Sequence, residues 1–135
     1  MEPTFHLEIV TPDRRVVSDV AAEMQLPGKN GYLGILPGHA PLITELAVGE
    51  ITYRNVEITS HLAVAWGFAE VLPDRVTILA QTAEKAEEID VARAQNARDR
   101  AQARLQGGDP ETDFDRALVA LERALVRLQV AAKRT

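Results

Sequence analysis

The sequence contains no cysteine among its 135 residues, and only 4% of them are aromatic. Without cysteine the chain has neither a disulfide framework nor a thiolate metal site. Apolar residues nevertheless make up 46% of the sequence, which is enough for a hydrophobic core. At this length we expect one ordinary domain, or one compact domain with an appendage.

Long hydrophobic runs are also missing. No stretch approaches the roughly 18 consecutive apolar residues that a membrane-spanning helix needs. The amino-terminal residues MEPTFHLEIV lack the basic segment and the long apolar segment of a secretory signal. We therefore expect a soluble, cytoplasmic protein without a membrane span.

The chain has fewer basic than acidic residues, and this difference is distributed unevenly along the sequence. The formal net charge is −5, which argues against a general nucleic-acid-binding protein. Residues 1–83 hold 10 acidic and 5 basic residues, whereas residues 84–135 hold 10 of each. The second part is therefore neutral but densely charged, and nearly all of its basic residues are arginines.

Up to about residue 80 the apolar residues recur at every second position. In Phe5–Ile9 and in Ile51–Tyr53 they alternate with polar residues, and side chains two apart share one face of a strand. The same spacing relates further apolar residues: Val56 and Ile58; Leu62, Val64 and Trp66; Val76 and Ile78. Short turn signals rich in Pro, Gly and Asp separate these runs. The pattern predicts an antiparallel β-sandwich or flattened barrel.

From about Asp90 the apolar period changes to that of a helix. A stripe of small residues consists of Val91, Ala94, Ala97, Ala101 and Leu105, and a second stripe of Phe114, Ala117, Leu118, Leu121, Leu125 and Leu128. Between them Gly107 or Gly108 can end one helix in the left-handed conformation. Asp109 or Thr112 can cap the next helix.

These two periods predict an α+β, mainly β, chain. We expect a β-sandwich over residues 1–84 and an antiparallel two-helix hairpin over residues 85–135. A slender helix pair buries little apolar area by itself. The hairpin should therefore be the mobile part, and its position should depend on the sandwich or on a partner.

Residues suited to catalysis or metal binding are few and scattered. The three histidines, His6, His39 and His61, have no partner three or four residues away, so surface or loop positions are more typical of them than metal ligation. Ser18 and Ser60 lie outside any nucleophile motif. Nothing in the sequence supports catalysis.

The segment GYLGILPGHAPLITEL, residues 31–46, mixes apolar residues with three glycines and two prolines. It can be a tight corner between strands, with glycines supplying positive φ. It can equally be an exposed apolar loop that contacts another subunit. The pattern favours neither interpretation.

Arginines recur at helical spacing in both predicted helices. Arg93, Arg100 and Arg104 share one face of the first helix, and the second helix repeats the spacing with Arg116, Arg123 and Arg127. Converging guanidinium groups suit a polyphosphate. Two other interpretations stay open: a solvated face neutralised by residues such as Asp99, and a basic surface that docks on an acidic protein segment.

Three segments, GYLGILPGHAPLIT, GFAEVLPDRVTILAQTAE and EEIDVARA, stand in this order before the helical pair. Together they resemble the epsilon subunit of bacterial F-type ATP synthases, and the resemblance covers essentially the whole chain. There are two departures. Trp66 stands where members often have glycine, and Tyr32 stands where they often carry an acidic residue that faces the membrane rotor.

The resemblance implies a non-catalytic rotor subunit of the central stalk, at the cytoplasmic face of the bacterial plasma membrane. In the family the sandwich binds the gamma subunit and the c-ring, while catalysis belongs to the beta subunits. The hairpin either folds down on the sandwich or extends along gamma toward alpha and beta. The extended form inhibits ATP hydrolysis, so a ligand of the folded form would shift this balance.

In some members that ligand is ATP, and its motif reads Ile/Leu-Asp-x-x-Arg-Ala. Ile89, Asp90, Arg93 and Ala94 match the fixed positions, and Glu84 matches an upstream acid that lies near adenine with Asp90. Further matching basic positions are Arg100, Arg123 and Arg127. The resemblance thus implies ATP as a regulatory ligand and no catalytic cofactor. Two alternatives remain: a hairpin that only docks on protein, and a stand-alone nucleotide-binding regulator.

Overall fold

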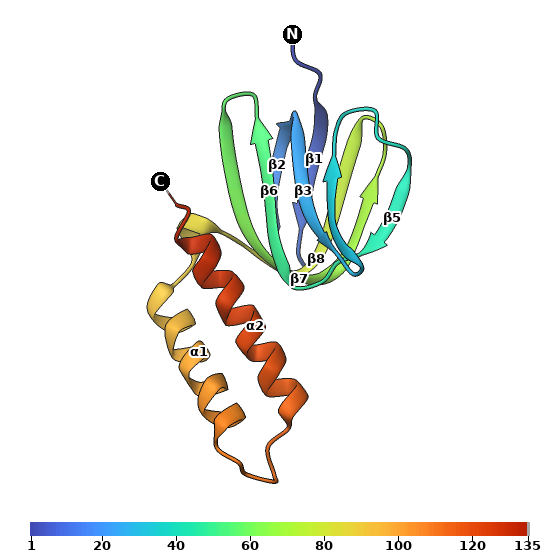
Figure 1. The fold of residues 1–135 in the computed structure, drawn as a ribbon. Helices are drawn as coiled ribbons and strands as arrows, with labels where there is room; N and C mark the ends of the chain where they lie inside the picture. Colours follow the sequence, from blue (N-terminus) through green and yellow to red (C-terminus); the bar gives the residue numbers. More distant parts are fainter. Residues whose placement is uncertain (135) are drawn as a thin grey trace.

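The computed structural model describes residues 1–134, which form a β-sandwich followed by a helical hairpin (Figure 1). The strands are β1 Phe5–Val10, β2 Arg15–Ala21, β3 Glu23–Gly28, β4 Gly31–Ile35, β5 Leu42–Glu45, β6 Gly49–Asn55, β7 Ile58–Val71 and β8 Arg75–Lys85. A short 3-10 helix, η1 Ala86–Glu88, leads to α1 Val91–Gln106 and α2 Phe114–Ala131. The predicted fold class is confirmed.

The sandwich is not a closed barrel. Its strands follow the order β2-β1-β8-β7-β6-β3-β4, and β5 pairs with β7. The long strand β7 pairs with β6 through its first half and with β5 through its last four residues. All ladders are antiparallel except β1–β8, which is parallel, so the antiparallel prediction is wrong for that one pair.

The burial predicted from alternation is wrong at two places, and both lie where the chain changes direction. Val56 and Ile58 are exposed because the chain reverses between the paired residues Asn55 and Ile58. Trp66 has a φ of 54° and turns away from the core, although Leu62 and Val64 on the same strand are buried. Gly67 follows with a φ of 113°, and these two residues bend β7 between its two ladders.

Elsewhere the alternation gives the core as predicted. The buried residues include Phe5, Leu7, Ile9, Ile51, Tyr53, Leu62, Val64, Val76 and Ile78. The segment over residues 31–46 contains two strands, β4 and β5; its glycines have the conformation that a tight corner requires, and a contact of its exposed residues with another subunit stays a prediction. Gly31 and Gly38 have positive φ, while Tyr32 and Ile43 are exposed.

The helix ends follow the sequence signals with one correction. Asp90 caps α1, since its side chain accepts a hydrogen bond from the backbone N–H of Arg93 at 3.1 Å. Gly108 takes the left-handed conformation after α1, with a φ of 66°. The cap of α2 is neither Asp109 nor Thr112: Asp113 caps it, by accepting from the N–H of Arg116 at 3.1 Å.

The helices contact each other through alanines. Ala94 and Ala101 of α1 are buried, as the small-residue stripe predicts. On α2 the buried residues are Ala117, Ala124, Val130 and Ala131. The predicted stripe of α2 is therefore confirmed only in part: Ala117 is buried and Leu121 and Leu128 are half-buried, but Phe114, Leu118 and Leu125 are exposed. Small side chains on both helices let the two backbones approach, which leaves the larger ones outside.

The hairpin docks on the sandwich by the carboxyl-terminal end of α2 (Figure 1). Val130 and Ala131 pack against Ala63, Ala86 and Ile89. A second contact is centred on Glu50 of β6, whose residue surface is only 5% exposed.

Glu50 receives its partners from the sandwich, from α2 and from Lys133, which follows α2. Its carboxylate accepts hydrogen bonds from Lys133 Nζ at 2.8 and 2.9 Å and from Gln129 Nε2 at 3.3 Å. His61 Nδ1 and the Thr52 hydroxyl lie within 3.0 and 2.9 Å of it. Burial raises the pKa of this carboxyl, but the hydrogen bonds from Lys133, His61 and Thr52 outweigh burial and leave the pKa below its ordinary value.

Candidate functional site

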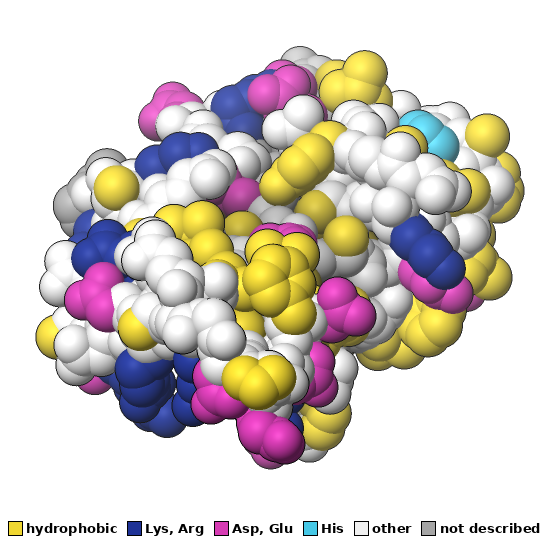
Figure 2. Space-filling model, turned by 60° about the horizontal axis from the view of Figure 1, so that its bottom comes forward, with side chains coloured by type: hydrophobic (Ala, Val, Ile, Leu, Met, Phe, Trp, Pro, Cys, Tyr) yellow, Lys and Arg dark blue, Asp and Glu magenta, His cyan; other side chains and the backbone are white. Residues whose placement is uncertain are grey.

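A cavity of about 520 Å³ lies between the sandwich and the hairpin. Its volume is within the range of roughly 300–1,000 Å³ that small-molecule sites occupy. The sandwich contributes side chains from the β1–β2 turn and from β8, and both helices contribute arginines. In Figure 2 most of the visible Lys and Arg side chains lie in separate groups on the left half of the molecule, with Asp and Glu among them, and the hairpin lies on the left in Figure 1.

Five of the eight predicted site residues line this cavity: Glu84, Arg93, Arg100, Arg123 and Arg127. They come from β8, α1 and α2, so the fold brings together residues up to 43 positions apart in sequence. The predicted convergence of the arginine faces is thus present in the folded chain. Arg104 and Arg116, which share the same helical spacing, lie outside the lining and are exposed.

The other three predicted residues, Ile89, Asp90 and Ala94, lie outside the cavity lining. Ile89 is buried against the end of α2, and Ala94 is buried at the helix pair. Asp90 caps α1 through the N–H of Arg93. In this fold these three residues fix where α1 begins and hence where Arg93 stands.

The cavity arginines differ in how they are held. Arg127 donates from Nε and Nη2 to the two carboxylate oxygens of Glu84, at 2.7 and 3.1 Å. Within residues 1–134, by contrast, Arg93, Arg100 and Arg123 form no ion pair. Asp99, expected as a neutralising neighbour, pairs with Arg98 instead. Three exposed guanidinium groups without a carboxylate partner among the described residues therefore line the cavity.

Apart from Glu84, the residues on the sandwich side of the cavity were not predicted. Thr11, Arg14 and Thr82 line it, and no local motif connects these residues with the hairpin. Arg14 also donates to both carboxylate oxygens of Glu88 in η1, at 3.0 and 2.9 Å. This contact lowers the pKa of Glu88 and ties the β1–β2 turn to the start of the hairpin.

The histidines do not assemble a metal site. Among the described residues no group of three or more His, Cys, Asp or Glu side chains is placed to hold a metal ion. His61 lies on β7 beside Glu50 and is not in a loop. In the same part of the chain, no helix has the length and apolar character needed to cross a membrane.

Comparison with known proteins accounts for the two-part architecture. Residues 4–86 match the family described as ATP synthase, Delta/Epsilon chain, beta-sandwich domain. Residues 87–132 match the family described as ATP synthase, Delta/Epsilon chain, long alpha-helix domain. The chain belongs to the ATP synthase delta/epsilon family. The resemblance seen in the sequence is thereby confirmed.

Bacterial members of the family are close in sequence. The ATP synthase epsilon chain of Koribacter versatilis is 69% identical over 111 residues, which cover 82% of this chain and 78% of that protein. The epsilon chain of Syntrophobacter fumaroxidans is 47% identical over 133 residues, covering 98% and 99% of the two chains. Epsilon chains are non-catalytic subunits, so this member of the family is an accessory subunit and not an enzyme.

Solved structures agree with this assignment. A chain of the Euglena gracilis mitochondrial ATP synthase, from an assembly of OSCP, F1 and c-ring, superposes with a TM-score of 0.81 at 25% identity. The match covers 97% of this chain and 82% of that chain. A chain from the central stalk and c-ring of the Tetrahymena thermophila enzyme shares the fold, with a TM-score of 0.58 at 13% identity over 98% and 96% of the chains.

Proposed function

We propose that this chain is a rotor subunit of the central stalk of a proton-translocating ATP synthase, and that its folded-down hairpin binds ATP as a regulatory ligand. The sandwich, residues 1–84, contacts gamma and the c-ring at the cytoplasmic face of the bacterial plasma membrane. The hairpin, residues 85–135, is the regulatory unit and reaches alpha and beta when extended. Binding of ATP to the folded form therefore opposes extension.

The three unpaired arginines at the cavity carry the ATP proposal. Arg93 and Arg100 of α1 and Arg123 of α2 keep their N–H donors free, and guanidinium groups suit phosphate oxygens. Several cations that line one cavity attract a multivalent anion. A triphosphate supplies the missing negative charge.

The stalk proposal is supported by an exposed apolar surface on the sandwich. Phe68 of β7 and Leu79 of β8 are paired across the ladder, and both are more than half exposed. Ile43 of the neighbouring strand β5 is exposed to 71%. Adjacent large apolar side chains on a sheet surface are typical of a contact with another subunit.

A second candidate function is a hairpin that docks only on protein. The exposed side chains Phe114, Leu118 and Leu125 of α2 favour it, because they follow one another at helical spacing on the outside of the hairpin. This surface and the arginine cavity lie on different sides of α2, so the two candidates predict different sensitive residues.

Equilibrium dialysis of ATP with the full chain separates the two candidates. We expect Arg93→Ala and Arg123→Ala each to weaken ATP binding at least about tenfold, as the loss of a charge-assisted contact does. Arg104→Ala is the matched control, since it removes an arginine of α1 outside the cavity. Unchanged affinity in both cavity variants leaves only the protein-docking function. Failure to co-purify with gamma would overturn the rotor assignment.

A further inference from the structure

Trp66 is the single tryptophan of the chain, and it stands in an unfavourable backbone conformation beside the hairpin. We propose that Trp66 is a positioning residue for Arg123. Its ring holds the guanidinium group at the cavity by a cation–π contact and leaves the N–H donors free for a phosphate ligand. This inference rests on the proposed ATP site and adds a residue to it.

The backbone at Trp66 is fixed by its surroundings. A Cβ atom at Gly67 would lie 1.9 Å from the carbonyl oxygen of Leu79, so the bend in β7 depends on this glycine. In the β7–β8 ladder Ala65 pairs with Thr82 and Gly67 with Ala80, and Trp66 between them has no paired residue. A φ of 54° is rare for a bulky residue and is retained only where the neighbouring structure imposes it.

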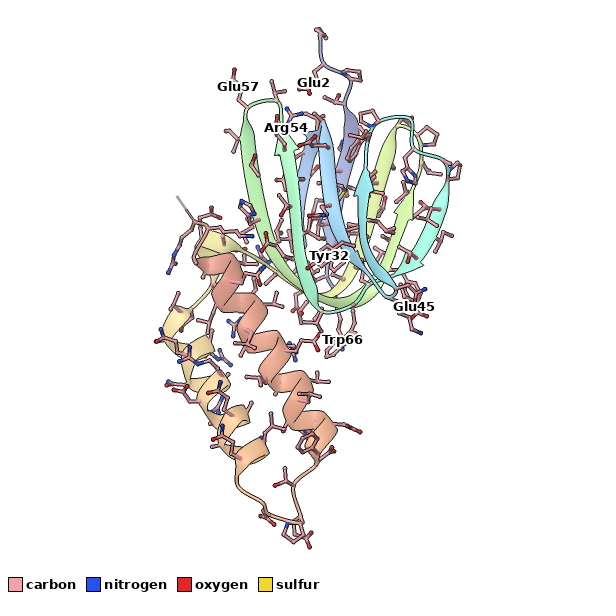
Figure 3. The ribbon with its side chains drawn as sticks, viewed as in Figure 1. Glu2, Tyr32, Glu45, Arg54, Glu57 and Trp66 are labelled. Atoms are coloured by element: carbon pink, nitrogen blue, oxygen red, sulfur yellow. The ribbon has the colours of Figure 1, made fainter. Side chains whose placement is uncertain are left out.

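This conformation directs the ring out of the sandwich. Trp66 remains 36% exposed, although its neighbours Ala65 and Val64 are buried. Figure 3 shows Trp66 at the end of the sandwich that faces α2. A large ring therefore stands at the boundary between the two parts of the molecule.

The partner of the ring is Arg123. Its Cζ atom lies 5.3 Å from the ring centroid, within the roughly 6 Å over which a cation is attracted to an aromatic face. Trp66 comes from β7 and Arg123 from α2, so the contact exists only while the hairpin is folded down.

The way Arg123 is held differs from the way Arg127 is held. Glu84 occupies two N–H donors of Arg127 and neutralises its charge. The face of an aromatic ring neither neutralises a guanidinium nor occupies its edge donors. Trp66 thus orients Arg123 while keeping it able to bind an anion, and Arg123 lines the cavity.

Equilibrium dialysis with ATP, using the full chain, tests this role. Trp66→Leu should weaken ATP binding about three- to tenfold, the range expected for a partly desolvated cation–π contact. Trp66→Phe keeps an aromatic face and should retain most of the affinity. Phe68→Leu is the matched control, because Phe68 is an exposed aromatic residue two positions along the same strand and outside the cavity.

A double variant distinguishes positioning from a general structural effect. If Trp66 acts through Arg123, Trp66→Leu has no further effect on ATP binding once Arg123 is alanine. Arg123→Ala should also shift the fluorescence emission of Trp66 with no ATP present. Equal ATP affinity of Trp66→Leu and wild type, or additive losses in the double variant, would overturn the role of Trp66 alone. Absence of ATP binding in the wild-type chain would overturn both this inference and the proposed function.

Discussion

The sandwich and the hairpin are held together in different ways. The sandwich has a core of large side chains such as Phe5, Leu7 and Ile51, contributed by strands from its whole length. The hairpin has an alanine interface and rests on the sandwich by one end of α2. Burying large apolar side chains stabilises a structure far more than burying alanines does. We therefore expect the sandwich to provide the stable frame and the hairpin to be the part whose position can change.

The largest effect we predict is in the sandwich. Gly67→Ala should lower the free energy of unfolding by about 3 kcal/mol or more, because the new Cβ meets the Leu79 carbonyl at 1.9 Å and φ is 113°. Gly108→Ala in the hairpin is the matched control: φ is also positive, at 66°, but nothing lies within 4 Å. It should cost about 1 kcal/mol. Urea unfolding measures both, and similar losses would contradict the distinction.

The next effect is within the hairpin. Ala124→Leu should destabilise the α1–α2 interface by about 1–3 kcal/mol, because the buried alanine lets the two helix backbones approach and a larger side chain would push them apart. Leu125→Ala, one residue along, removes an exposed side chain and should change stability by less than about 0.5 kcal/mol. Hydrogen exchange of α1 and α2 resolves the difference. If Leu125→Ala lowered the stability of the hairpin more than Ala124→Leu does, the helices would be held by the apolar stripe predicted from the sequence and not by the alanines.

A substitution at the contact between the sandwich and the hairpin should have a larger effect than a substitution on an exposed face of either helix. Glu50→Gln removes the carboxylate that Lys133 binds at 2.8 Å, and should favour the undocked hairpin by about 1.5 kcal/mol, roughly a tenfold change in population. Because the chain has no cysteine, labels at Glu57→Cys and Gln102→Cys can report the separation of sandwich and hairpin. The control is Glu45→Gln, an exposed partner of Lys29. An unchanged distance distribution in Glu50→Gln would show that the docked state does not depend on this contact.

Acid should produce the smallest of these effects. The pKa of Glu50 lies below its ordinary 4.5, because its hydrogen bonds outweigh burial, so its ionised form stabilises the docked hairpin. This contribution is complete above about pH 4.5 and is lost as the pH falls through the folded-state pKa. Glu88, whose pKa Arg14 lowers, acts in the same direction. The label distance followed from pH 6 to roughly pH 3.5 should lengthen, and less so in Glu50→Gln.

Most of the architecture was accessible from the sequence because each part has one clear period. Alternation gave the buried strands, and helical spacing with Asp90 and Gly108 gave α1. The errors at Val56 and Trp66 occur where backbone reversal or bending overrides alternation. The predicted apolar stripe of α2 is only partly buried because the two helices meet through alanines, and this contact leaves the larger apolar side chains outside.

For the candidate site, too, local spacing predicted some of the residues and missed the others. Arginines at helical spacing predicted one face on each helix, and five of the eight predicted site residues do line the cavity. The sandwich side, including Thr11 and Arg14, meets the hairpin only where α2 docks, and the docking contact joins Glu50 to Lys133, 83 residues further along the chain. Local spacing carries no information about such a pairing.

The central claim is that ATP binds a site formed by the sandwich and the folded hairpin together. The most direct measurement is the label distance between Glu57→Cys and Gln102→Cys as ATP is added to the full chain. ATP should increase the docked population with rising concentration, because it binds only that form, and Arg123→Ala should abolish the response. A distance distribution that does not change with ATP, or that shifts toward the extended hairpin, would contradict the account.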